Sequence, residues 1–320
     1  MKILGHRGCF YETENTIKSI IKAFELGADG VEVDVQSTLD NYIVLSHDVN
    51  LKRITGFDYD IRKNSFLKLS KIDLNGEKIP LLEDVLELVK SENKIVDIEV
   101  KNPDDIKEVC NIVSRFNYDG YIISSFFHKN IFNYKKILPK INFAYLFSHE
   151  PKDIKEYIKE VDFLKPNINY LTKDYKLYSQ KVIPWVVNDS KEFEYIKEFE
   201  PYGVITDFPD KLKMFLNKKE IPANFLIYYL TKSILKEESF IDKNIIKIVL
   251  KNLFLDLIID DIKINNKVLD IGKNYPIYWK IGEKILINIE NYSLDDKLII
   301  KIKNIGFYEI EIKELIKTFN

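Results

Sequence analysis

The sequence is short of the features that mark secreted, membrane-spanning and nucleic-acid-binding proteins. It has only two cysteines, Cys9 and Cys110, among 320 residues, too few for a disulfide framework and suited to a reducing compartment. No apolar run reaches the roughly 18 to 20 residues that a membrane-spanning helix requires. The opening MKILGHRG lacks the apolar core of a signal peptide, and the net charge of −2 provides no basic face for nucleic acid. We therefore expect a cytoplasmic protein that does not bind nucleic acid.

Short apolar runs rich in β-branched residues alternate with amphipathic stretches from the first residue to about residue 217. This alternation predicts a parallel sheet covered by helices. The predicted strands are Ile3–Gly5, Val31–Val35, Tyr42–Ser46, Ile95–Val100, Tyr121–Ser124, Asn142–Phe147, Asp162–Lys165, Val182–Val187 and Gly203–Thr206. The predicted helices are Asn15–Leu26, Leu82–Lys90, Asp105–Phe116, Lys129–Ile137, Lys152–Lys159, Asp174–Gln180, Ser190–Phe199 and Asp210–Leu216.

Nine predicted strands are one too many for an eightfold barrel. The gap between Val31–Val35 and Tyr42–Ser46 is too short for a parallel crossover, which needs about a dozen residues, but long enough for a hairpin. The second run is therefore predicted to return antiparallel to the first, with a turn at Asp40 and Asn41. Eight parallel strands remain, and they predict a (β/α)₈ barrel of the TIM type over residues 1–217. An open doubly wound sheet is the alternative fold.

The pattern changes after residue 217. Residues 222–256 have the apolar and aromatic spacing of helices, in NFLIYYLTKSIL and NIIKIVLKNLFLDL, whereas residues 257–312 alternate like short strands. Residues 218–320 are therefore predicted to form an accessory domain that is partly helical and mainly β. Its apolar helix face favours packing against protein over contact with a membrane surface. No motif in this domain carries chemistry, and the sequence specifies no oligomeric state.

Two predicted strands each carry charged side chains at alternate positions. Glu32 and Asp34 project from one face in GVEVDVQ, and Asp97, Glu99 and Lys101 do the same in IVDIEVKN. Catalytic groups of a TIM-type barrel lie at the carboxyl ends of its strands. Buried carboxylates repel one another and are costly to desolvate, and a divalent cation offsets both penalties. Oxygen ligands favour Mg²⁺ or Ca²⁺, with Mn²⁺ as a third option, over zinc. The alternative is a solvated edge strand without a metal.

Two histidines and two cations accompany these carboxylates. His6 follows the first predicted strand, and His47 ends the predicted hairpin. With a two-residue turn, His47 falls opposite Asp34, which brings it level with the carboxylates. Two imidazoles that titrate near neutral pH can act as general base and general acid. Arg7 and Lys101 provide the positive charge that a phosphodiester requires, although they would also neutralise the carboxylates.

These residues stand in blocks that resemble the glycerophosphodiester phosphodiesterases in order and spacing. The resemblance covers about residues 3–217, and it departs from the family at Thr13, where proline is common, and at Phe127, where asparagine is frequent. The blocks are LGHRG, ENT at 14–16, GADGVEVDVQST from 27, HD-x-x-L-x-R-x-T at 47–55, IPLLEDVLEL at 79–88, DIEVK at 97–101, ISSF at 123–126, WVVN at 185–188 and GVITDFPD at 203–210.

The resemblance implies metal-dependent hydrolysis of a glycerophosphodiester to glycerol 3-phosphate and an alcohol. The implied site residues are His6 and His47 for acid/base catalysis, Glu32, Asp34 and Glu99 for the divalent cation, Arg7 and Lys101 for the phosphate, and Trp185 for the glycerol. One alternative is a lysophospholipase D-type reaction on a larger lipid, which Phe10, Tyr11 and Phe127 near the barrel mouth would favour. The other is a catalytically inactive barrel used for binding.

Overall fold

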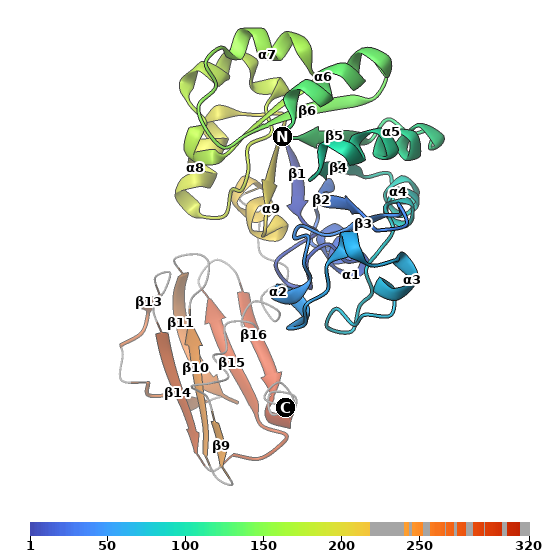
Figure 1. The fold of residues 1–320 in the computed structure, drawn as a ribbon. Coiled ribbons are helices and arrows are strands. Elements are labelled where there is room, and N and C mark those ends of the chain that lie inside the picture. The colour runs from blue at the N-terminus through green and yellow to red at the C-terminus, as the bar shows by residue number, and fades with distance from the viewer. Residues whose placement is uncertain are drawn as a thin grey trace. The chain divides into compact units, whose positions relative to one another are not determined.

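The chain folds into two compact units, Met1–Leu216 and Asn217–Asn320 (Figure 1). The computed structural model describes residues 1–217, 240–242, 245–251, 257–265, 267–271, 274–279, 284–290, 292–302 and 306–313. None of the helices in these ranges combines the length and the apolarity needed to cross a membrane.

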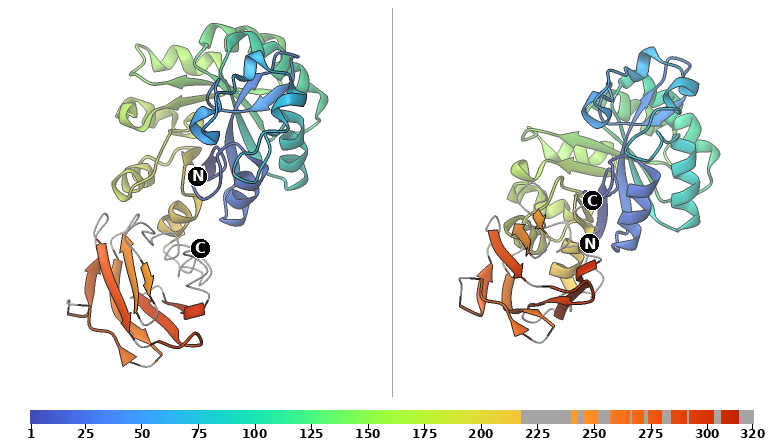
Figure 2. Two further views of the ribbon diagram at one scale, coloured as in Figure 1. Left: turned by 60° about the horizontal axis from the view of Figure 1, so that its bottom comes forward. Right: turned by 90° about the horizontal axis from the view of Figure 1, so that it is seen from below.

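The first unit is a barrel of parallel strands with helices around its outside (Figure 2). The strands lie in the order β1–β2–β4–β5–β6–β7, and β8 pairs with the other edge of β1. Their side chains are almost all buried, as expected for strands covered by helices on one face and packed inside a barrel on the other. The parallel strands are β1 (Lys2–His6), β2 (Gly30–Ser37), β4 (Ile95–Val100), β5 (Tyr121–Ser125), β6 (Asn142–Phe147), β7 (Phe163–Pro166) and β8 (Gly203–Thr206).

The remaining position in the barrel belongs to the predicted strand Val182–Val187, which is irregular. Ile183 and Trp185 donate backbone hydrogen bonds to β7, and Val187 donates one to β8. Pro184 lies between them and has no N–H, so a regular ladder is interrupted at that point. The run still joins β7 to β8, and the (β/α)₈ barrel predicted from the sequence is confirmed.

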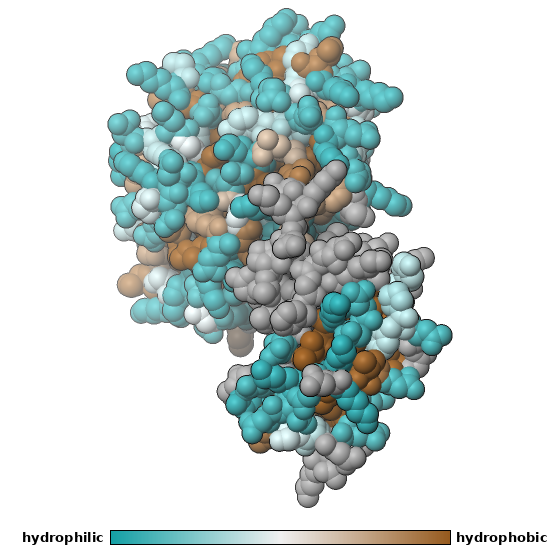
Figure 3. Space-filling view, turned by 180° about the vertical axis from the view of Figure 1, so that it is seen from behind, coloured by the Kyte–Doolittle hydropathy of each residue, from teal (hydrophilic) through white to brown (hydrophobic). Residues whose placement is uncertain are grey.

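The helices cover the barrel, and their polar faces form much of its surface. Thr16 caps α1 by accepting a hydrogen bond from the Ser19 N–H, and Asp189 caps α8 in the same way at the N–H groups of Lys191 and Glu192. Figure 3 shows hydrophilic side chains over most of one face of this unit. The predicted helices are confirmed to within two residues, except that Asp174–Gln180 forms the 3₁₀ run η4 (Lys173–Lys181). The helices are α1 (Ile17–Glu25), α4 (Leu82–Ser91), α5 (Ile106–Arg115), α6 (His128–Ile137), α7 (Ile154–Glu160), α8 (Ser190–Phe199) and α9 (Pro209–Asn217), with 3₁₀ turns η2 (Pro103–Asp105) and η3 (Ile168–Tyr170).

The hairpin after β2 is confirmed, but its predicted register is wrong. β3 (Ile43–Leu45) runs antiparallel to β2 with Leu45 opposite Val35. The Thr38 N–H donates to the Tyr42 carbonyl, so three residues form the turn instead of two. Every pair is therefore displaced by one position, and Ser46, rather than His47, donates a backbone hydrogen bond to the carbonyl of Asp34.

The chain after β3 forms a lobe larger than the predicted hairpin excursion. It contains α2 (Lys52–Thr55), η1 (Ile61–Lys63) and α3 (Phe66–Leu69), each too short to show a helical period in the sequence. The lobe has its own buried apolar cluster, made of Val44, Leu51, Ile61, Leu69, Leu74 and Ile79.

The second unit is built from antiparallel strands in its described residues. One sheet has the order β14–β10–β9, and the other has the order β12–β11–β15–β16 with β13 also paired to β11. The predicted helix over 222–256 is wrong where the structure describes it, because Ile246, Ile248 and Leu250 are buried at the two-residue spacing of a strand. Residues 222–239 of that prediction lie outside the described ranges. The strands are β9 (Phe240–Asp242), β10 (Ile245–Lys251), β11 (Leu257–Ile264), β12 (Lys267–Val268), β13 (Ile277–Trp279), β14 (Lys284–Glu290), β15 (Lys297–Ile302) and β16 (Gly306–Glu311).

Candidate active site

A pocket opens among the carboxyl ends of the barrel strands. Seven of the eight predicted site residues line it, and the eighth, Asp34, contacts Arg7 and Lys101. They meet because parallel strands bring their carboxyl ends to the same edge of a barrel. The lining residues are His6, Arg7, Glu32, His47, Glu99, Lys101, Phe126, Leu146, Lys165, Trp185 and Ile205.

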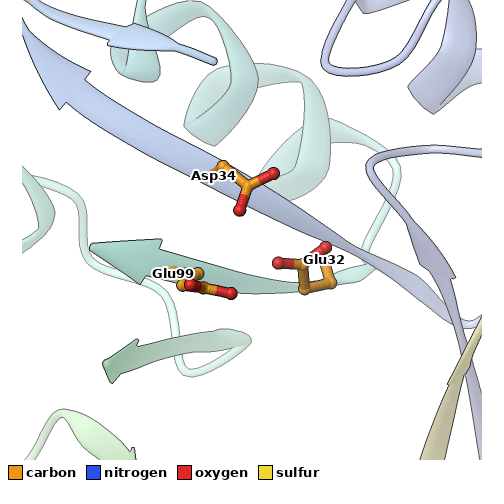
Figure 4. A group of neighbouring side chains, drawn as sticks. All are labelled: Glu32, Asp34 and Glu99. Atoms are coloured by element: carbon orange, nitrogen blue, oxygen red, sulfur yellow. The ribbon is translucent and has the colours of Figure 1, made fainter. Parts of the chain in front are cut away.

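Three carboxylates from two adjacent strands form a compact cluster (Figure 4). Glu32 and Asp34 share one face of β2, and Glu99 lies directly opposite Asp34 on β4. One oxygen of each carboxylate lies within 4.8 Å of the others, and all three side chains are almost completely buried. This is the arrangement that the two-residue spacing in the sequence predicts.

The charges around the cluster leave it short of positive charge. Burial, together with repulsion from Asp34, raises the pKa of Glu32. Burial acts in the same direction on Asp34, but Lys101 at 3.3 Å and Arg7 at 3.1 Å hold the pKa of Asp34 below its ordinary value. A hard divalent cation bound between the carboxylates would relieve this repulsion, and the all-oxygen donor set suits Mg²⁺, Ca²⁺ or Mn²⁺. The three residues therefore fit the metal that the sequence predicts.

Asn15 holds the cluster in place from the loop before α1. Its side-chain amide donates to the Asp34 carboxylate at 3.0 Å and accepts from the Asp34 N–H at 3.1 Å. The residue is buried and has a φ of 56°, a left-handed conformation that asparagine tolerates better than most residues. Asp34 is thus fixed by its own strand and by a neighbouring loop.

His6 ends β1 and is held by a carboxylate from the far end of the barrel sequence. Its Nδ1 lies 2.7 Å from Oδ1 of Asp207, and Asn188 donates to the other oxygen of Asp207 at 2.6 Å. Burial lowers the pKa of His6, but the hydrogen bond to Asp207 and the charge of Glu32 outweigh burial and raise it overall. Because Nδ1 is engaged, Nε2 is the ring nitrogen left for the pocket.

His47 reaches the pocket from the loop after β3. Its Nδ1 lies 2.7 Å from Oδ1 of Asp48, so its Nε2 is also left free by that contact. The loop is fixed by Gln36, whose side chain donates to the carbonyls of Ser46 and His47. The strand ends at Leu45, so the side chain of His47 does not follow the strand alternation that the predicted register assumed.

Three basic side chains line the pocket, those of Arg7, Lys101 and Lys165. Arg7 has a φ of 52° and is followed by Gly8 at 93°, where a Cβ atom would lie 1.9 Å from the Ser19 hydroxyl. The turn that presents Arg7 therefore requires glycine at position 8. Lys101 Nζ lies 2.6 Å from Glu99, and Lys165 is fully buried.

Aromatic side chains form another wall of the pocket. The Trp185 indole donates to the carbonyl of Lys165 at 2.8 Å and packs edge-on against Phe126, with ring centroids 6.0 Å apart. Phe126, rather than Phe127, lines the pocket. Tyr11 is buried and donates to Asp210, so it is not part of the open mouth as the sequence suggested.

Sequence reasoning missed the partners of the site residues. Asp48 directly follows His47, and Asp207 directly follows β8, where the other site residues also lie at strand ends. Those positions could have marked both as candidates. Glu14, whose carboxylate contacts Nη1 of Arg7 at 3.0 Å, is visible in the sequence only as part of the ENT block, because that contact depends on how two loops meet. Lys165 is the last residue of the predicted strand Asp162–Lys165, a position at which the site residues of other strands also lie.

Comparison with known families supports the same assignment. The model of the glycerophosphoryl diester phosphodiesterase family matches residues 6–211. A glycerophosphodiester phosphodiesterase of Caldanaerobacter subterraneus subsp. tengcongensis is 29% identical over 232 residues, which cover 66% of this chain and 95% of that protein. A lysophospholipase D of Homo sapiens is 27% identical over 274 residues, covering 68% of this chain and 86% of that protein.

Solved structures agree with the barrel. The glycerophosphodiester phosphodiesterase of Thermotoga maritima superposes with a TM-score of 0.58 at 29% identity, covering 68% of this chain and 98% of that one. The Oleispira antarctica phosphodiesterase, in complex with the product sn-glycerol-3-phosphate, has a TM-score of 0.63 at 23% identity, covering 68% and 97%, and supports the fold. From the motif blocks, the barrel and the family match, we conclude that the chain belongs to the glycerophosphoryl diester phosphodiesterase family and is a phosphodiesterase.

Proposed function

We propose that the protein hydrolyses glycerophosphodiesters to glycerol 3-phosphate and an alcohol, with a divalent cation held by Glu32, Asp34 and Glu99. The observation that supports this most directly is the position of two histidine–aspartate pairs around the same pocket as the buried carboxylates. The product named for the Oleispira antarctica structure is the one that this reaction would release.

The metal-binding carboxylates and the basic side chains of the pocket have different roles in this proposal. When bound, Mg²⁺, Ca²⁺ or Mn²⁺ supplies Lewis-acid polarisation of a phosphate oxygen. Arg7 and Lys101 line the pocket beside the carboxylates, so they can hold the remaining phosphate oxygens. Trp185 provides an apolar wall against which the glycerol carbons can pack.

The histidines carry the proton transfers. One imidazole removes a proton from the attacking oxygen, which belongs either to water or to a glycerol hydroxyl, and the other protonates the oxygen of the departing alcohol. If the glycerol hydroxyl attacks, water then opens the cyclic phosphate to give glycerol 3-phosphate. Asp207 and Asp48 fix the tautomers in which Nδ1 carries the proton, so each Nε2 is directed to the substrate. Two separate rings, each with its own carboxylate, allow one to act as base while the other acts as acid.

The same proposal includes the division of the chain into two domains and the compartment in which the protein acts. The barrel of residues 1–217 carries the catalytic groups, since every pocket residue lies between His6 and Ile205. Residues 218–320 form an accessory domain. Both cysteines are free and buried, which agrees with a function in the reducing cytoplasm.

A lysophospholipase D-type reaction on a larger lipid is the second candidate. Phe126 lines the pocket and is 41% exposed, and Phe10 is 63% exposed beside Phe208. Such a rim can hold an acyl chain, and the human relative carries the name of that activity. A barrel used only for binding is less consistent with the complete set of acid/base and carboxylate groups.

The test is release of glycerol 3-phosphate from glycerophosphocholine and its ethanolamine and glycerol analogues. Turnover should stop with EDTA, because EDTA removes the cation that polarises the phosphate oxygen in this proposal. Turnover should return when Mg²⁺ or Ca²⁺ is added. His47→Ala should lower kcat by about 10²–10⁴. The matched control is His149→Ala, since His149 is exposed and lies outside the pocket. Turnover of lysophospholipid alone would favour the second candidate, and a folded, metal-binding protein that hydrolyses no diester would contradict both.

A further inference from the structure

Arg53, on the short helix α2 of the lobe, bonds to two carboxylates that belong to different sides of the site. Its Nη1 and Nη2 donate to the two oxygens of Glu14 at 2.9 and 2.6 Å. Its Nε donates to Oδ2 of Asp48 at 2.7 Å. Glu14 lies in the loop before α1, so a single guanidinium joins the lobe to the barrel.

Each of these carboxylates also holds a residue that lines the pocket. Asp48 contacts Nδ1 of His47 through its other oxygen at 2.7 Å, and Glu14 contacts Nη1 of Arg7 at 3.0 Å. A continuous chain of charged contacts therefore runs from His47 through Asp48, Arg53 and Glu14 to Arg7. It links a predicted acid/base residue with a predicted phosphate ligand.

The two carboxylates that Arg53 contacts, Glu14 and Asp48, are ionised. Burial raises the pKa of Glu14, but the hydrogen bond from Arg53 and the charge of Arg7 outweigh burial and lower it overall. Asp48 behaves in the same way, with His47 and Arg53 lowering its pKa against burial. Both carboxylates can therefore accept from the guanidinium across the neutral pH range.

This series of charged contacts requires arginine at position 53 for a geometric reason. A guanidinium offers donors in a planar fork, so one edge can take both oxygens of Glu14 while Nε takes Asp48. A lysine ammonium is a single charged centre and cannot reproduce that fixed pattern. The Arg53 side chain is 51% exposed, so its ion pairs contribute little to stability. It does not line the pocket, so these contacts do not serve direct binding of the substrate.

We propose that Arg53 is a positioning residue of the active site. It holds Asp48 so that His47 keeps its proton on Nδ1 and presents Nε2 to the pocket. It also holds Glu14, which aims the guanidinium of Arg7. The effect on turnover rests on the proposed function, whereas the effect on the ring of His47 does not.

The first measurement is steady-state kinetics on glycerophosphocholine with Arg53→Met and Arg53→Lys. Arg53→Met should lower kcat/KM by about 10²-fold, because small displacements of reacting groups have effects of that size. Arg53→Lys should restore only part of the loss. The control is Arg115→Met, since Arg115 is 62% exposed and pairs only loosely with Glu83 on the outside of the barrel.

The second measurement reads the histidine directly and needs no turnover. Nitrogen-15 spectra of the neutral imidazoles report which ring nitrogen carries the proton, and the signals of His47 and His6 among the four histidines can be assigned with His47→Gln and His6→Gln variants. Wild-type His47 should be protonated at Nδ1, and Arg53→Met should shift it toward the Nε2–H form while His6 stays unchanged.

The two measurements separate the inference from the proposed function. An unchanged His47 tautomer in Arg53→Met overturns the inference, whatever the variant's rate. A wild-type protein that hydrolyses no diester, but whose His47 tautomer shifts in Arg53→Met, contradicts the proposed function and supports the inference.

Discussion

At the scale of single residues, the site uses the same local arrangement twice. Each histidine has an aspartate on Nδ1 at 2.7 Å. Asp48 is the next residue after His47, whereas Asp207 stands 201 residues from His6. A carboxylate on Nδ1 fixes the tautomer and favours the imidazolium that forms when the ring takes a proton. In both rings Nδ1 is thus engaged by a carboxylate, which leaves Nε2 for the proposed proton transfer.

Removal of the charge of Asp207 should change the titration of His6. In Asp207→Asn, burial still lowers the pKa of His6, but one of the contacts that raises it is lost. The pKa of His6 should therefore move down, and any limb of the pH–rate profile that reports it should shift toward lower pH. Proton NMR titration of the metal-free protein measures this, with Asp295→Asn as an exposed control. A pKa of His6 that stays in place or rises would contradict the account.

The sequence predicted the members of the site better than their supports. Glu32, Asp34 and Glu99 follow from strand alternation, and alternation does not depend on loop geometry. His47 lines the pocket although its predicted pairing with Asp34 is wrong, because the turn has three residues and the strand ends early. Glu14 could not be predicted as a partner of Arg7, since that contact depends on two loop conformations.

At the scale of elements, three strands are joined inside the barrel by a buried ion pair and the serine hydroxyl that both of its members contact. Lys165 on β7 lies 2.5 Å from Asp97 on β4, and both contact the hydroxyl of Ser124 on β5. All three side chains are fully buried. The opposite charges compensate each other there, so removal of one leaves the other without its charged partner at a position that has no solvent exposure.

Lys165→Met should therefore destabilise the barrel by about 3–5 kcal/mol. Much of that loss should be recovered in the double variant Lys165→Met with Asp97→Asn, because the uncompensated charge is removed while the contact with Ser124 can remain. Urea unfolding followed by circular dichroism measures both. Lys159→Met is the control, since its pair with Glu156 on the surface of α7 has side chains 67% and 64% exposed and should contribute little to stability. Equal losses in Lys165→Met and Lys159→Met would refute the argument.

Elements were predicted well where their periodicity was strong and poorly where it was weak or mixed. The strands Ile95–Val100 and Asn142–Phe147 and the helix Ser190–Phe199 have the predicted bounds. The run Ile245–Lys251 is predicted to be helical from the sequence because its apolar residues fit both periods over a short window. Its content of isoleucine and valine favours a strand, and pairing with β14 decides the outcome.

At the scale of the whole molecule, the residues of the candidate site and the family resemblance both stop before the second unit. The pocket residues end at Ile205, and the family match ends at residue 211. The alignment with the Caldanaerobacter protein covers 95% of that relative but only 66% of this chain. Nearly the whole of that relative is thus accounted for without a counterpart of the second unit.

The barrel alone should therefore hydrolyse a soluble diester. Its sheet is complete within residues 1–217, because β8 pairs with β1 and each pocket residue is supplied by those strands and their loops. A chain ending at residue 217 should keep kcat/KM for glycerophosphocholine within about threefold of the full chain, a change of less than about 1 kcal/mol in the barrier. Circular dichroism and the urea midpoint establish that the shortened chain is folded. A folded barrel that loses more than tenfold would mean that residues 218–320 supply part of the site. Loss confined to lysophospholipid in vesicles would instead assign the second unit to presenting a lipid substrate.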